Sequence, residues 1–159
     1  MKTIFLLAAI VFSMSAPAQV TKVSLQASGL TCSMCSNSIN RALKKLDFVD
    51  KIDSDIKTYT FEITFKPKAN VDFDMIKTKV EGAGFSVSGF IVTMNFNKVL
   101  VKENQPVLIG DKTFLFVNKN EQLLDGEKQV RLLDKGFVSA REYKSTSYSI
   151  LPLTYHASI

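Results

Sequence analysis

Hydrophobic and polar residues follow a strand-like and then a helix-like period at the start of the first half of the chain. In residues 22–28 every second side chain is apolar, which predicts a half-buried strand that ends at Gly29. An amphipathic helix is predicted next, from apolar positions spaced by three, four and seven residues: Ile39, Ala42, Leu43 and Leu46. A strand and a helix are therefore expected on either side of the segment that begins at Gly29.

The same periods continue to residue 90. Ile52 and Ile56 fall in a short strand, and residues 59–66 alternate again until Pro67 stops that strand. Asp72 is placed to cap a second helix, whose inner stripe consists of Phe73, Ile76, Val80 and Ala83. A fourth strand begins at residue 85. The order β-α-β-β-α-β predicts an α+β, ferredoxin-like fold for residues 19–90, with both helices on one face of an antiparallel sheet.

Short apolar runs separated by turn-forming residues occupy residues 91–159. The runs lie at 99–101, 107–109, 114–117, 130–133 and 148–151. Strands at this spacing predict a small β-rich module of unknown role, an antiparallel sandwich or barrel. Residues 139–143 are expected to form a helical turn. Because no linker rich in Gly, Ser or Pro separates the halves, we expect them to pack together, with the fourth strand free to continue past Phe90.

The first 18 residues have the layout of a secretory signal peptide. Lys2 precedes an apolar run of nine residues, 4–12, and Ala16 and Ala18 form a small-x-small cleavage signal. The run is too short to span a bilayer, which takes roughly 20 residues. We therefore expect a periplasmic or secreted protein without a membrane span in the mature chain. Both cysteines would then meet an oxidising compartment.

Composition excludes several function classes. Hydrophobic residues make up 46% of the chain and charged residues 22%, as in ordinary globular domains. The net charge of +5 is spread evenly, without a basic stripe between aromatic residues, so nucleic-acid binding is not expected. With two Cys and one His the chain has too few ligands for a structural zinc site. The lone His makes no convincing catalytic triad, and Asp53 and Asp55 have the pattern of solvated turn residues. We therefore predict no enzyme.

The residues with distinctive chemistry lie in the loop between the first strand and the first helix. This loop is Gly29-Leu30-Thr31-Cys32-Ser33-Met34-Cys35, followed by Ser38-Ile39 and Ala42-Leu43. Together with Glu81-Gly82-Ala83-Gly84-Phe85, it resembles the heavy-metal-associated domain. That family includes copper chaperones, the N-terminal modules of copper-exporting ATPases and the periplasmic mercury-binding protein. The resemblance covers residues 21–90 and nothing beyond them.

The resemblance implies that Cys32 and Cys35 bind one soft metal ion through their sulfurs. The residue types agree, because thiolates favour Cu(I) over hard ions such as Mg²⁺ and the positive end of a helix stabilises a thiolate beside it. We predict Cu(I), bound for trafficking, homeostasis or detoxification, with Hg(II) as the alternative ion. The expected partners are the metal ion and a metal-transporting membrane protein or another metal-binding domain.

Two other interpretations of the cysteine pair stay open. The Cys-x-x-Cys motif also occurs in thiol–disulfide oxidoreductases, although this chain has no Trp and not the element order of a thioredoxin. The pair can also close a small structural disulfide, which would constrain few residues of the unfolded chain.

Three side chains outside the pair are relevant to the metal. Phe85 occupies the position that lies near the metal in the family, where its ring would shield the site. Met34 is a candidate thioether ligand, but an exposed loop residue without a role is the expected outcome. His156 lies on a polar tail and is expected to fray rather than to act as an auxiliary ligand.

Overall fold

The computed structural model of the chain describes residues 19–117, 120–145 and 152–159. The signal peptide expected at 1–18 and the strand expected at 148–151 lie outside these residues. The first half has the predicted order of elements, namely β1 (Gln19–Ser28), α1 (Ser33–Leu43), β2 (Val49–Asp55), β3 (Thr60–Phe65), α2 (Phe73–Gly82) and β4 (Ser86–Val101).

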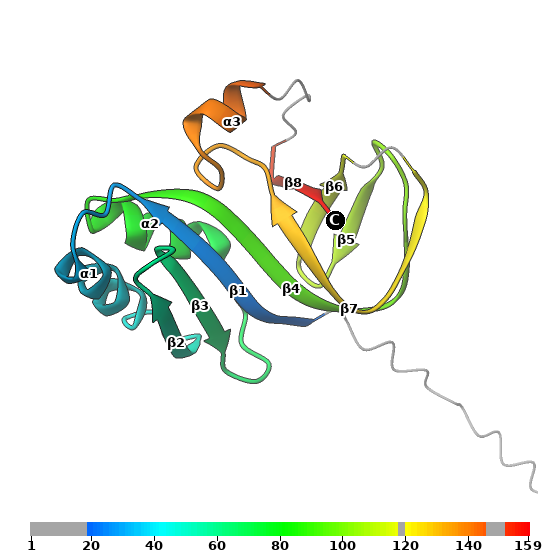
Figure 1. Cartoon of the computed structure of the whole chain (residues 1–159). Helices are drawn as coiled ribbons and strands as arrows, with labels where there is room; N and C mark the ends of the chain where they lie inside the picture. The colour runs from blue at the N-terminus through cyan, green and yellow to red at the C-terminus, as the bar shows by residue number, and fades with distance from the viewer. Residues whose placement is uncertain (1–18, 118–119, 146–151) are drawn as a thin grey trace, which may run out of the picture.

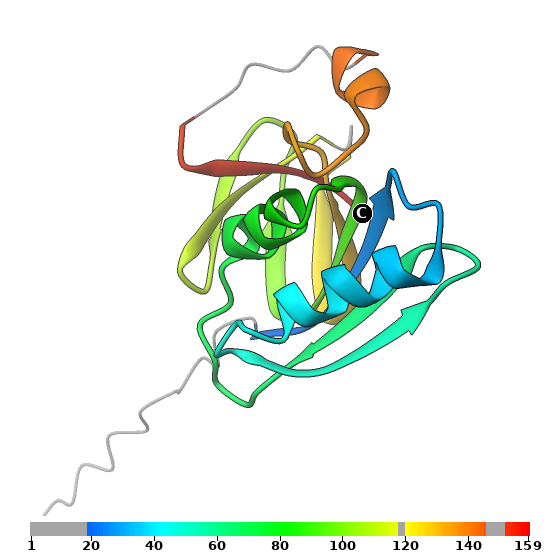
Figure 2. The ribbon, with the colours of Figure 1, turned by 90° about the vertical axis from the view of Figure 1, so that its left-hand side faces the viewer.

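Antiparallel strands in the order β2-β3-β1-β4 form the first part of the sheet, and α1 and α2 cover one of its faces (Figures 1 and 2). The predicted ferredoxin-like α+β fold is confirmed. The inner stripes of the two helices supply fully buried side chains to the core: Ile39, Leu43, Phe73, Ile76 and Val80. Asp72 caps α2 as predicted, because its Oδ1 accepts a hydrogen bond of 2.9 Å from the backbone N of Met75.

The long strand β4 carries the sheet across residue 90. It has 16 residues and pairs with β1 on one edge and with β7 (Gln122–Leu132) on the other. Beyond β7 the sheet continues with β8 (Thr154–Ser158), β6 (Lys112–Phe116) and β5 (Pro106–Ile109), giving the order β2-β3-β1-β4-β7-β8-β6-β5. The helical turn expected near residue 140 is present as α3 (Ala140–Ser145). The division of the chain at residue 90 stays a prediction.

The second half differs from the expected antiparallel sandwich or barrel in two respects. Its strands extend the sheet of the first half, and β6 and β8 run parallel to each other. The first difference arises because buried and exposed residues continue to alternate in β4 well past the first half. The second edge of β4 can therefore pair with β7. The parallel pair is possible because the chain passes through β7 and α3 between β6 and β8.

Aromatic side chains join the two halves into one hydrophobic core. The ring centroid of Tyr155 in β8 lies 5.4 Å from that of Phe73 in α2, 5.8 Å from Phe114 and 5.9 Å from Phe137. Phe90 of β4 lies 5.0 Å from Phe137. The halves thus pack against each other, as the lack of a linker indicates. No helix in the described part of the chain combines the length and apolar character needed to cross a membrane.

Candidate metal centre

The backbone at the end of β1 directs the chain into α1 and leaves the cysteine loop at the surface. Gly29 has a φ of +88°, a left-handed conformation that glycine adopts without strain. Leu30 is buried and anchors the loop to the core. Cys32 is the N-cap of α1, and Cys35 lies in its first turn, where its backbone N donates to the Cys32 carbonyl at 3.1 Å. Both sulfurs are therefore carried at the N-terminal end of a helix.

The two thiols lie side by side. Their Sγ atoms are 2.9 Å apart and both cysteines are free. Cys32 is exposed and Cys35 half-buried. The first turn of α1 contains no acidic residue, so no side chain of that turn offsets the positive end of the helix dipole. The pair is thus open to solvent on one side and favours negative charge.

The pKa of the Cys35 thiol is lowered to about 7, first by the hydrogen bond with the Cys32 side chain and next by one with the Thr31 backbone. Near neutral pH the pair therefore carries a substantial fraction of one thiolate, with the remaining proton shared between two neighbouring sulfurs. A thiolate is the form of cysteine that binds metals and attacks electrophiles. Both metal binding and thiol chemistry are accessible to this pair without a separate base.

The set of donors fits a soft ion of low coordination number. Among residues 19–117, 120–145 and 152–159, no group of three or more His, Cys, Asp or Glu side chains is arranged to hold a metal. Two sulfurs would leave zinc two ligands short of its usual tetrahedral set. Soft thiolates select ions such as Cu(I).

Met34 and Phe85 take different places around the loop. Met34, between the cysteines, is 78% exposed and extends into solvent. Phe85 is half-buried against the core, and its Cδ1 lies 3.9 Å from the position that a Cβ on Gly29 would occupy. The Phe85 ring thus lies against Gly29 at the base of the cysteine loop.

The expectation that His156 frays on a polar tail was wrong. His156 is fully buried in β8, beside Leu115 of β6. Its Nδ1 lies 2.6 Å from Asp134 Oδ1, and its backbone N donates to Asp134 Oδ2 at 2.7 Å. The terminal segment is ordered because it fills the gap between β6 and β7, a long-range pairing that periodicity alone does not reveal. Figure 1 shows β8 well separated from the loop before α1.

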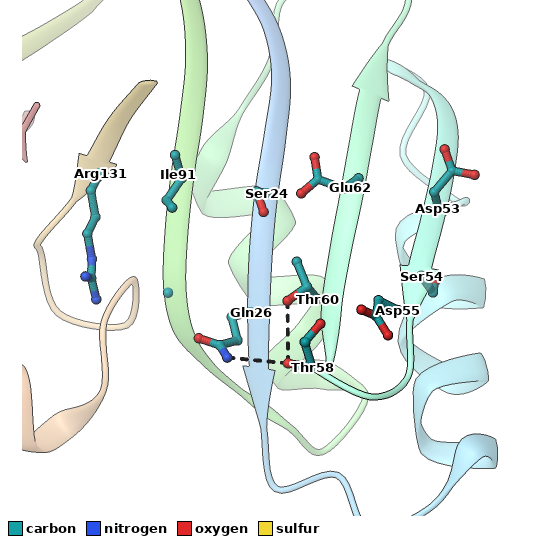
Figure 3. A pocket seen from close by; sticks show the side chains of 11 residues that line it. Ser24, Gln26, Asp53, Ser54, Asp55, Thr58, Thr60, Glu62, Ile91 and Arg131 are labelled. Carbon is teal, nitrogen blue, oxygen red and sulfur yellow. Dashed lines mark hydrogen bonds between the residues drawn. The ribbon is translucent and has the colours of Figure 1, made fainter. Parts of the chain in front are cut away.

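A hollow lies on the face of the sheet opposite the helices, and the cysteines are not part of its lining. Its volume is about 640 Å³, and its lining residues, most of them polar, come from five neighbouring strands, β2, β3, β1, β4 and β7, and from the turn between β2 and β3 (Figure 3). Gln26 Nε2 and Thr60 Oγ1 both donate to the Thr58 carbonyl at 3.4 Å. Of its acidic groups, Asp53 pairs with Lys51 and Glu62 with Lys22, and Asp55 Oδ1 accepts a hydrogen bond of 2.8 Å from a backbone N–H.

Sequence reasoning missed one polar residue near the cysteines, Ser36. Its side chain is 4% exposed, and its Oγ has no hydrogen-bond partner among the described residues. The signal was present in the helical period, because Ser36 precedes Ile39 by three residues and Leu43 by seven and so shares their buried stripe.

Comparison with known proteins assigns part of the chain to a family. Residues 24–86 match the model of the heavy-metal-associated domain. The chain is 34% identical over 64 residues to a probable copper-exporting P-type ATPase of Archaeoglobus fulgidus, and 32% identical over 69 residues to the probable copper-transporting ATPase HMA5 of Arabidopsis thaliana. These matches cover 40% and 43% of this chain but only 8% and 7% of the relatives. The chain thus spans less than a tenth of the length of these curated relatives.

Solved structures are similar over the same part of the chain. The yeast copper transporter domain Ccc2a, studied in its apo and Cu(I)-loaded states, is 36% identical; the match covers 42% of this chain and 90% of that domain, with a TM-score of 0.38. A copper-binding domain from the P-type ATPase HMA7 is 31% identical, over 43% of this chain and 90% of that domain, with a TM-score of 0.39. Over residues 24–86, this chain belongs to the heavy-metal-associated domain family, whose members are metal-binding domains.

Proposed function

We propose that this protein binds one Cu(I) ion through the sulfurs of Cys32 and Cys35 and passes it to a partner. The observation that carries the proposal is the pair of free thiols at the N-terminus of α1, 2.9 Å apart and open to solvent. Two soft sulfurs satisfy a monovalent soft ion, whereas they leave harder or four-coordinate ions short of ligands.

Copper is preferred over mercury on the evidence of the curated relatives. Both relatives that match the domain are described as probable copper transporters. The donor set alone does not separate the two ions, because Hg(II) also favours two thiolates. Hg(II) is therefore the comparison ion in the test below rather than a second proposal.

Exposure of the site suits transfer more than storage. Cys32 is exposed, so a thiolate of a partner can approach the ion before either protein sulfur leaves it. Exchange of this kind replaces one metal–sulfur bond at a time and needs no oxidant or reductant. The partner class that fits is another thiolate-bearing metal domain, either free or attached to a membrane transporter.

We propose an exported location on the basis of residues 1–18. An oxidising compartment converts two thiols that lie this close into a disulfide, which cannot hold the ion. The 2.9 Å separation therefore also supports a second candidate, a redox module that moves two electrons between dithiol and disulfide. Metal loading and oxidation would compete for the same two sulfurs.

A Cu(I) competition titration tests the proposal. The reduced protein from residue 19 to 159 is titrated against a chromogenic chelator, beside Cys32→Ser and Cys35→Ser, with Hg(II) and Zn(II) as comparison ions. We expect one equivalent of Cu(I) in the unaltered protein and loss of that binding in either variant. Failure of the fully reduced protein to compete would overturn the copper proposal. Turnover in a disulfide-reductase assay would then favour the redox module.

A further inference from the structure

A hollow at the end of the sheet that carries the cysteine loop is lined by both halves of the protein. Its volume is about 710 Å³. The first half contributes the end of β1, one flank of α2 and the start of β4, and the second half contributes residues of the segment 135–144, which leads into α3. The lining residues that matter here are Ser28, Lys77, Glu81, Ser86, Lys135 and Lys144.

The hollow adjoins the base of the cysteine loop. Ser28 in its lining stands four residues before Cys32, so the two Cα atoms are at most about 14 Å apart. Ser86 directly follows Phe85, whose ring lies against the start of the loop. Since β1 and β7 both run antiparallel to β4, they end toward the same end of the sheet, and α3 lies beyond that end (Figure 2).

The cysteine loop has no charge of its own, whereas the segment 135–144 is basic. Residues 27–40 contain no Asp, Glu, Lys or Arg. The one acid of the basic segment, Glu142, is neutralised by Arg131, whose Nη2 lies 2.9 Å from its Oε2. The basic residues of the segment are exposed and form no ion pair with a described residue: Lys135, Arg141 and Lys144.

The first half adds little net charge to the hollow. Lys77 pairs with Asp74, their Nζ and Oδ1 atoms being 2.8 Å apart, and Glu81 is the one acid in the lining. The uncompensated positive charge beside the neutral loop therefore comes from the second half.

A partner that exchanges a metal ion at the sulfurs also covers this hollow. A standard interface buries about 800 Å² on each protein, a patch roughly 30 Å across, so an interface centred on the sulfurs reaches the basic segment. Charges at the rim of such an interface chiefly set the association rate and the choice of partner. Positive charge at this place favours a partner with an acidic surface.

On the basis of the function proposed above, we propose that residues 135–144 and the adjoining hollow are the docking surface for the protein that receives Cu(I), and that this protein has acidic side chains next to its own thiolates. Each partner thiol that binds Cu(I) releases its proton, and each cysteine sulfur that leaves the ion takes one up. Copper stays Cu(I), so no oxidant or reductant takes part. The second half thus acts in partner choice and not in metal binding.

Transfer of Cu(I) to two synthetic peptides tests the docking surface. Both peptides carry the same Cys-x-x-Cys sequence and a fluorophore that Cu(I) quenches, one flanked by glutamates and the other by lysines. We expect the reduced, Cu(I)-loaded protein to supply the acidic peptide about tenfold faster at low ionic strength, the lower end of the usual effect of electrostatic steering. Added salt should reduce this preference, because it screens exposed charges.

The double variant Lys135→Glu/Lys144→Glu should lose the preference for the acidic peptide and keep its Cu(I) affinity in chelator competition. Lys44→Glu/Lys45→Glu is the matched control, because it changes the net charge equally at exposed positions beyond the C-terminal end of α1, away from the sulfurs. We expect the control to keep the preference. If the glutamates impair folding, Lys135→Gln/Lys144→Gln makes the same comparison, with a reduced preference expected.

The two proposals fail in distinguishable ways. If the unaltered protein does not compete for Cu(I), the proposed function is wrong and the docking surface falls with it. If the unaltered protein binds Cu(I) but the two double glutamate variants show equal preference, the docking surface alone is overturned. Binding to vesicles of anionic lipid that depends on Lys135 and Lys144, without a preference between the peptides, would also overturn it in favour of a membrane contact.

Discussion

The hydroxyl of Tyr155 donates a hydrogen bond of 2.7 Å to Asp74 Oδ2 and so connects the last strand of the chain to the first turn of α2. Burial, and next the Asp74 carboxylate, raise the pKa of Tyr155, so the phenol keeps its proton at physiological pH. Asp74 also pairs with Lys77 at 2.8 Å. The second half thereby holds the helix whose C-terminal end leads through Phe85 to the base of the cysteine loop.

Replacing Tyr155 with Phe should cost about 1 kcal/mol of stability, because one exposed hydrogen bond to a charged group is lost while the ring remains. Chemical denaturation of the metal-free protein measures this loss. Tyr59→Phe is the control, since the Tyr59 hydroxyl makes no hydrogen bond with a described residue. Equal stability of the Tyr155→Phe and unaltered proteins would show that the contact does not stabilise the fold.

Replacing Phe137 with Ala should destabilise the protein by about 3–5 kcal/mol, the usual cost of deleting a buried ring. Phe137 packs against Phe90 and Tyr155, and the Lys77 Nζ lies 4.9 Å from its ring centroid. Because this ring contacts both halves, we expect the protein to unfold in a single transition and the substitution to shift that whole transition. Two transitions, with the variant affecting only one of them, would contradict a shared core.

Replacing Asp134 with Ala should cost about 2–3 kcal/mol, since both of its contacts to buried His156 disappear. Cu(I) affinity should stay unchanged, because His156 is buried in the second half and not at the cysteine loop. The measurement pairs denaturation with chelator competition. If the variant is as stable as the unaltered protein but binds Cu(I) more weakly, the prediction is wrong and His156 contributes to the metal site.

Alkylation of Cys35 should follow a pH profile centred near its lowered pKa of about 7. The thiolate reacts, so the rate rises as pH increases through that value and falls below it. Cys32→Ala removes the largest cause of the lowered pKa, the hydrogen bond between the two side chains, and should move the profile toward higher pH. Iodoacetamide labelling followed by mass spectrometry locates the modified cysteine. A profile unchanged by Cys32→Ala would show that the Cys32 side chain does not lower the pKa of Cys35.

Local periodicity was sufficient to predict the first half of the fold. The strand and helix periods around Ile39 and Phe73, and the cap at Asp72, are short-range signals that the structure confirms. The cysteine loop was predictable for the same reason, since its residues are contiguous and lie between a strand and a helix.

The second half depends on contacts between residues distant in sequence, which periodicity does not encode. The parallel pairing of Phe114 with Tyr155 places the terminal segment inside the sheet. The burial of His156 follows from that pairing and not from its own polar neighbours. Ser36 was missed although the helical period places it on the buried stripe of α1, and its lack of a hydrogen bond is visible only in the structure.

X-ray absorption spectroscopy of the Cu(I)-loaded protein is the most direct test of a two-thiolate copper site. We expect two sulfur neighbours around the ion, no nitrogen or oxygen neighbour, and loss of this spectrum when Cys32 or Cys35 is changed to Ser. A nitrogen neighbour would contradict a two-thiolate site, because the one histidine is buried in β8. A third sulfur within a single protein molecule would also contradict it and would point to Met34, the thioether between the two cysteines.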